Sequence, residues 1–169
     1  MEIVLVRHAQ PEWVRDGFTI DDPPLTERGH RQAAALAGRL AEETFDEVHV
    51  SPLLRTRQTA APYLQRLGGG DRRKHVAVAP WAEEIRNPVW HGTPAEKAEE
   101  AFKADRAKPS HERWSGLPGG EDVRSFVARV REGVGLFLEE RGIAPTGGAL
   151  PVWSVRDPAR RILLVAHAG

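Results

Sequence analysis

Two histidines in this sequence each stand directly behind a run of apolar residues. Residues 3–6 are apolar and lead into Arg7 and His8, and residues 162–166 are apolar and lead into His167. Short continuous runs of this kind predict fully buried strands. The carboxyl ends of parallel strands are where open α/β sheets bind their ligands. We therefore expect both histidines at the ligand-binding edge of a sheet.

A further cationic side chain stands at the start of a predicted helix. Residues 47–50 form a short strand, after which Ser51 and Pro52 have the residue types of a helix cap and a first-turn proline. Arg55 follows on the first turn, where a cation opposes the helix dipole and is best explained by an anionic partner. The free N–H groups of the helix and the planar guanidinium of Arg55 together predict an anion site. Arg57 is expected at the surface or behind the site.

Arg7, His8, Arg55 and His167 thus converge at one edge of the predicted sheet. Two arginines beside two histidines favour a bound phosphate and disfavour a bound cation. The other histidines lack the spacing of metal ligands. We predict neither a metal site nor another cofactor.

The elements that must position these residues alternate between strand and helix. Residues 10–24 show no period and predict a loop over the first strand end. Thr26 is a suitable N-cap for a helix that extends to about residue 40. A second helix follows residue 51 and stops at the glycines of residues 68–70.

The second half continues the alternation. Residues 75–79 predict a third strand, and residues 123–138 form the clearest amphipathic helix, with Glu121 as the acid that caps it. Residues 143–160 predict a long loop with a hairpin strand around residues 152–155. This order indicates an α/β domain with a largely parallel sheet and right-handed crossovers.

The composition bounds the class of protein. The chain has 169 residues, which fits one domain over residues 1–169, and its 24 basic residues balance 24 acidic ones, so no overall field favours nucleic acid or an anionic membrane. No stretch nears the roughly 20 apolar residues of a membrane span, and the start lacks a secretory signal. The absence of cysteine excludes disulfides and thiolate chemistry. We predict a cytoplasmic protein without nucleic-acid or membrane partners, and leave its oligomeric state open.

Six short segments, spread over nearly the whole chain, form a further pattern. They are Arg7-His8-Ala9, Leu25-Thr26-Glu27-Arg28-Gly29 with Gln32-Ala33, Ser51-Pro52-Leu53-Leu54-Arg55 with Gln58-Thr59-Ala60, Glu84-Ile85 with Trp90-His91-Gly92, Gly119-Gly120-Glu121, and His167-Ala168-Gly169. Each is weak alone, but together and in this order they resemble the histidine phosphatase superfamily, also called the phosphoglycerate mutase-like family. The resemblance implies a three-layer α/β/α fold with a mostly parallel sheet.

The resemblance also implies a role for each matching residue. His8 is similar to the nucleophile that attacks phosphorus and becomes phosphohistidine, which imidazole can do at neutral pH because its ordinary pKa is about 6.5. Arg7, Arg55 and His167 resemble the residues that hold the phosphoryl oxygens and offset their charge. Glu84 is similar in position to the proton donor of the leaving oxygen. The implied activity is metal-independent hydrolysis of a small phosphomonoester.

Glu83 is the neighbouring candidate for the proton donor. Glu84 is preferred because its spacing to Trp90 and Gly92 matches the family segment.

A departure from the family pattern follows Trp13. The family often has an asparagine there that contributes to the phosphate pocket, and this chain has Val14. Mutases of the family typically keep the asparagine, so phosphoglycerate mutase-type transfer is the alternative enzymatic hypothesis and hydrolysis is favoured.

The sequence stops at Gly169, directly after the second histidine motif. Family members usually continue into a further helix and an edge strand, whose first turn supports that histidine. The fold described by residues 1–169 is therefore expected to lack both; either the domain is truncated at its C-terminus or His167 is less firmly held than in relatives. A native end at this point would favour a third hypothesis, a non-catalytic phosphate-binding module.

Overall fold

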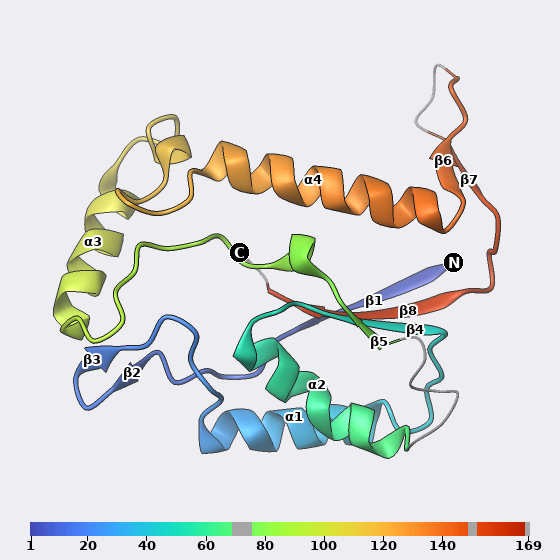
Figure 1. Cartoon of the computed structure of the whole chain (residues 1–169), viewed down its shortest axis with the longest axis horizontal. Helices are drawn as coiled ribbons and strands as arrows, with labels where there is room; N and C mark the ends of the chain where they lie inside the picture. Colours follow the sequence, from blue (N-terminus) through green and yellow to red (C-terminus); the bar gives the residue numbers. More distant parts are fainter. Residues whose placement is uncertain (69–75, 149–151, 168–169) are drawn as a thin grey trace.

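Four parallel strands form the central sheet (Figure 1). The computed structural model describes residues 1–68, 76–148 and 152–167. Across the sheet the strands are β1 (Glu2–Arg7), β8 (Arg161–Ala166), β4 (Glu47–Val50) and β5 (Val76–Val78), and each neighbouring pair is parallel. The largely parallel sheet predicted from the sequence is confirmed. The third predicted strand is β5, and His75 at its expected start lies outside the described residues.

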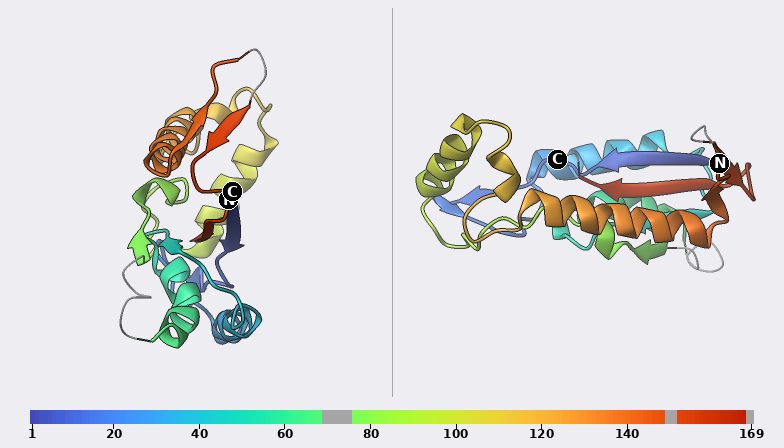
Figure 2. Two further views of the ribbon diagram at one scale, coloured as in Figure 1. Left: turned by 90° about the vertical axis from the view of Figure 1, so that its right-hand side faces the viewer. Right: turned by 90° about the horizontal axis from the view of Figure 1, so that it is seen from above.

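Helices cover both faces of this sheet. In Figure 1, α1 (Glu27–Arg39) and α2 (Leu54–Arg66) lie on one face and α4 (Val123–Glu140) lies on the other. The view from above in Figure 2 shows α4 running along the strands. The three layers implied by the resemblance are therefore present.

The two apolar runs that precede the histidines differ in burial. β8 lies between β1 and β4, and its residues Ile162, Leu163 and Val165 are at most 1 % exposed. β1 is an edge strand, and only its alternate residues Val4 and Val6 pack against the core, whereas Leu5 is 72 % exposed. The prediction of a fully buried strand is right for β8 and wrong for β1. A continuous apolar run does not reveal whether a strand is central or at an edge.

The predicted loop after β1 contains a short hairpin. Its strands are β2 (Val14–Arg15) and β3 (Phe18–Thr19). Thr19 N donates to Thr93 O at 2.9 Å, which ties the hairpin to the residues before α3 (Ala95–Ala107). In Figure 1 the hairpin and α3 stand at the end of the molecule toward which the strands point.

Four smaller elements complete the described chain. Two are 3₁₀ turns: η2 (Pro80–Ala82) precedes α3 in the chain, and η3 (Arg113–Ser115) follows it. The hairpin strand expected around residues 152–155 is β7 (Trp153–Val155), and its partner β6 (Ile143–Pro145) lies in what the sequence predicted as loop. Among the described residues, no helix is both long and apolar enough to cross a bilayer.

Candidate active site

Strand pairing brings the two histidines together. β1 and β8 pair in register, with Arg7 opposite Ala166, so that His8 and His167 leave the sheet side by side. His8 N donates to Ala166 O at 3.0 Å, and the two imidazole centroids are 5.2 Å apart. Two residues separated by most of the chain thus form one site at the carboxyl edge of the sheet.

The His8 ring is held in one tautomer. Its Nδ1 lies 2.8 Å from the carbonyl oxygen of Ala9. A carbonyl can only accept, so Nδ1 carries the proton and Nε2 keeps its lone pair. Burial lowers the pKa of His8, and the positive charges of Arg55 and Arg7 lower it further, against opposing contributions from the Ala9 carbonyl and Glu84. The free base is therefore the favoured form.

Two buried hydrogen bonds in series fix the main chain directly after His8. Ala9 N donates to Thr59 Oγ1 at 2.9 Å, and the Thr59 hydroxyl donates to Arg55 O on the first turn of α2 at 2.7 Å. Thr59 is 1 % exposed. These hydrogen bonds link the position of His8 to that of α2, the helix that bears Arg55.

The His167 side chain is 4% exposed, and one of its two ring nitrogens has a hydrogen-bond partner among the described residues. Its Nε2 lies 2.8 Å from Ser51 Oγ, and its Nδ1 has no hydrogen-bond partner among the described residues. Burial, followed by the charge of Arg55 and contributions from His8 and Arg7, lowers the pKa of His167 to about 3. The ring is neutral at ordinary pH, and with Ser51 donating to Nε2 its Nδ1–H would be free for a ligand.

Arg55 is a buried guanidinium without hydrogen bonds from two of its nitrogens. The residue is 2 % exposed, and its Nε and Nη1 have no hydrogen-bond partner within the described parts of the chain. Asp22 Oδ1 lies 3.7 Å from Nη1, and the Trp13 ring lies 4.8 Å from the guanidinium carbon. Burial lowers the pKa of Arg55 from its ordinary value and outweighs the opposing charges of Asp22, Glu84 and Glu83.

The other two predicted cations, Arg7 and Arg57, are exposed to solvent. Arg7 is exposed at the end of β1, yet its charge contributes to the lowered pKa values of both histidines. Arg57 is exposed on α2, as expected. Among the described residues, no group of three or more acidic or histidine side chains has the arrangement of a metal site.

Geometry separates the two candidate carboxylates. Glu84 Oε2 is 3.9 Å from His167 Nδ1, so Glu84 faces the site. Glu83 instead accepts from Arg86 Nη2 at 2.7 Å and from its Nε at 3.1 Å. This arrangement favours Glu84 for work on a ligand held between the histidines.

Two helix caps predicted from the sequence are wrong. Ser51 does not cap α2, because the helix begins at Leu54, whose N–H donates to Asp22 Oδ1 at 2.8 Å. Ser51 turns toward His167 instead. Glu121 does not cap α4, because Asp122 Oδ1 accepts from Ser125 N at 2.9 Å.

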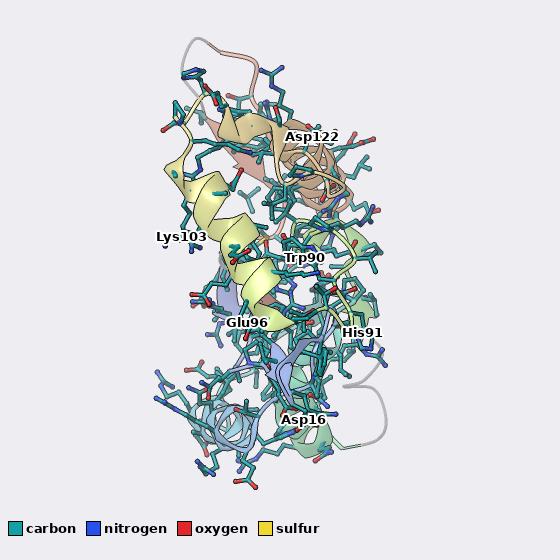
Figure 3. The ribbon with its side chains drawn as sticks, turned by 90° about the vertical axis from the view of Figure 1, so that its left-hand side faces the viewer. Asp16, Trp90, His91, Glu96, Lys103 and Asp122 are labelled. Atoms are coloured by element: carbon teal, nitrogen blue, oxygen red, sulfur yellow. The ribbon has the colours of Figure 1, made fainter. Side chains whose placement is uncertain are left out.

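A pocket of about 280 Å³ adjoins the Glu84 segment. Its lining includes Arg86, Phe102, Arg113 and Trp114. Figure 3 shows this end of the molecule, with α3 crossing it and Trp90 beside the helix. The rings of Trp90 and Phe102 pack at 5.2 Å.

Comparison with protein families gives one match over nearly the whole chain. The model of the histidine phosphatase superfamily (branch 1) matches residues 3–169. The chain is 33% identical over 148 residues to phosphoserine phosphatase 1 of Hydrogenobacter thermophilus, covering 83% of this chain and 64% of that protein. It is 43% identical over 134 residues to a 2,3-bisphosphoglycerate-dependent phosphoglycerate mutase of Bartonella tribocorum, covering 76% and 64%. The chain thus spans slightly less than two thirds of these relatives.

Solved structures agree on the fold. The α-ribazole phosphatase of Shigella flexneri superposes with a TM-score of 0.67 at 24% identity, covering 99% of this chain and 74% of that one, a likeness of fold alone. A mycobacterial glucosyl-3-phosphoglycerate phosphatase in complex with inorganic phosphate superposes with a TM-score of 0.63 at 28% identity, covering 96% and 71%.

Proposed function

The chain belongs to the histidine phosphatase superfamily, and from this membership we propose that it hydrolyses small phosphomonoesters through a phosphohistidine formed on His8. One observation carries the proposal. Among the described residues, Arg55 Nε and Nη1 and His167 Nδ1 are buried without hydrogen-bond partners, the His167 ring lies 5.2 Å from that of His8, and the charge of Arg55 contributes to the lowered pKa of His8. Unpaired buried donors are costly, and an anion of several oxygens would satisfy them together.

The proposed reaction has two steps. In the first, His8 Nε2 attacks phosphorus in line, the bond to the leaving oxygen breaks, and Glu84 gives that oxygen its proton. Arg7, Arg55 and His167 hold the other phosphoryl oxygens. In the second step Glu84 takes a proton from water, which attacks phosphorus and frees His8 together with inorganic phosphate. His8 thus attacks phosphorus from one side in the first step, and water attacks it from the opposite side in the second.

Phosphoglycerate mutase-type transfer is the second candidate, because a relative with 43% identity carries that name. It would use the same phosphohistidine and differ only in the acceptor, which is a hydroxyl of the product and not water. Incubation with a phosphoglycerate separates the two functions: a hydrolase releases phosphate, whereas a mutase interconverts the isomers without release.

The test compares the chain with its His8→Ala variant on an aryl phosphate in the presence of a chelator. We expect phosphate release by the parent alone, with a drop of at least about 10³-fold in the variant because the nucleophile is gone. Alkaline quenching should trap one phosphoryl group on the peptide that contains His8. Equal release by both proteins, or loss of all activity with chelator, would overturn the proposal.

A further inference from the structure

The segment that carries Glu84 has no regular secondary structure of its own. After η2, residues 83–90 belong to neither a helix nor a strand. A proton donor must nevertheless be held within a fraction of an ångström of the leaving oxygen. The contacts that fix this segment therefore decide where the Glu84 carboxyl stands.

Arg129 of α4 contacts the main chain at the start of this segment. Its Nη1 donates to Glu83 O at 3.2 Å and to Trp81 O at 3.4 Å, and its Nη2 lies 3.4 Å from Glu84 O. One guanidinium thus contacts the main-chain carbonyls of three residues within a stretch of four. Gly133, one turn farther along α4, lets the helix approach closely, since a Cβ there would lie 2.1 Å from Trp81 Cβ.

Glu121 holds Arg129 and the other side of the segment. Its carboxylate accepts from Arg129 Nε at 3.0 Å and from Nη2 at 2.8 Å, a two-pronged pair in which the side chains are 11 % and 21 % exposed. The same carboxylate accepts from Arg86 N at 3.1 Å, and Glu121 N donates to Arg86 O at 2.7 Å. The hydrogen bond from Arg129 keeps the pKa of Glu121 below its usual value, which favours the ionised pair.

We infer that the Glu121–Arg129 pair is a positioning device for the proton donor Glu84, which it holds through the main chain of residues 81–86. The inference rests on the proposed function. Neither residue is assigned to touch the phosphoryl group. Their side chains bond to each other and to main-chain groups, and Figure 3 shows the start of α4, marked by Asp122, behind α3. The pair therefore governs protonation of the leaving oxygen and leaves phosphoryl binding unchanged.

The decisive readout is the dependence of rate on the leaving group. kcat/KM reports the steps up to departure of the leaving oxygen, where an alkoxide needs a proton and a nitrophenolate does not. We expect Glu121→Gln to lower kcat/KM for phosphoserine by about 10–100-fold, because small displacements of a catalytic group have effects of this size. For p-nitrophenyl phosphate the loss should stay below about threefold. Arg129→Lys should give the same pattern, because an ammonium cannot reproduce the two-pronged pair.

Three further proteins make the result interpretable. Glu84→Gln is the benchmark and should show the same leaving-group pattern with a larger loss. Glu132→Gln and Arg131→Lys, at exposed positions of α4, match the chemical changes and should leave both substrates unaffected. If Glu121→Gln unfolds, Arg129→Lys decides the question.

An equal loss for both substrates, or no loss for phosphoserine, in a folded variant would overturn the inference while the proposed function stands. Phosphate release that does not depend on His8, or no release by the parent, would instead refute the proposed function. The two failures are distinguishable because the parent and the His8→Ala variant are assayed in the same series.

Discussion

Replacing Arg55 by methionine should stabilise the free protein and abolish its response to phosphate. Two buried nitrogens of the Arg55 guanidinium have no hydrogen-bond partner among the residues that the structure describes, and an unsatisfied buried donor costs about 1–3 kcal/mol. Against this, the Trp13 ring contributes about 1 kcal/mol. Asp22, whose side chain is 48% exposed and 3.7 Å away, contributes less than about 1 kcal/mol. Methionine keeps most of the packed stem, so the net gain is about 2 kcal/mol.

Thermal unfolding with and without inorganic phosphate measures both effects. A gain of about 2 kcal/mol corresponds to a rise in Tm of about 4–8 °C for a chain of this size. In the parent, phosphate at a hundred times its Kd should add about 2.7 kcal/mol of stability. In the variant most of that increment should disappear, because the guanidinium that pairs with the anion is gone.

Arg57→Met is the matched control, since Arg57 lies on the same helix and is exposed. It should change stability by no more than about 0.5 kcal/mol and retain the full response to phosphate. An Arg55→Met variant that is less stable than the parent, or that is stabilised by phosphate as much as the parent is, would refute the argument that the buried Arg55 guanidinium destabilises the free protein and binds an anion.

Two predictions about pH and one about close packing complete the set. The lowered pKa of His8 predicts that kcat/KM holds its plateau below the ordinary histidine pKa of about 6.5, and an acid limb centred at or above that value would contradict it. His167 has a folded pKa of about 3, so below about pH 6.5 the unfolded chain binds more protons and stability is lost as the pH falls toward 3; urea unfolding of His167→Asn should lack this part of the slope. Gly29→Ala should destabilise the fold, because its Cβ would lie 2.2 Å from Gln10 O, whereas Gly38→Ala on the same helix meets nothing within 4 Å and should stabilise by up to about 1 kcal/mol; equal effects in thermal unfolding would contradict the contact.

The sequence predicts most of what depends on strand ends. His8 and His167 each follow an apolar run, and parallel strands present their carboxyl ends at one edge, so their meeting requires only that the strands be neighbours. Arg55 is marked by a local conflict, a cation on the first turn of a helix. These signals lie within a few residues of each position, which is why they are visible in the sequence.

Contacts between distant side chains are not visible in this way. Ser51 has the residue type of a helix cap, and only the register of β4 and β8 turns its hydroxyl to His167, 116 positions away. Gly133 and Gly135 are indistinguishable in the helical pattern. The structure shows that a Cβ at Gly133 would collide with Trp81, whereas one at Gly135 would meet nothing within 4 Å.

The site divides its polar groups into two kinds. Those proposed to hold the phosphoryl group, Arg55 and His167, have buried nitrogens without hydrogen-bond partners in the part of the chain that the structure describes. Those behind them, Glu121 and Arg129, are paired with each other and with main-chain groups. Unpaired donors weaken the free fold and strengthen ligand binding, whereas paired groups fix geometry and offer nothing to a ligand. Glu84 joins the two kinds, because its main chain is held by the paired set while its carboxylate accepts from Ile85 N through Oε1 and places Oε2 3.9 Å from the unpaired His167 Nδ1.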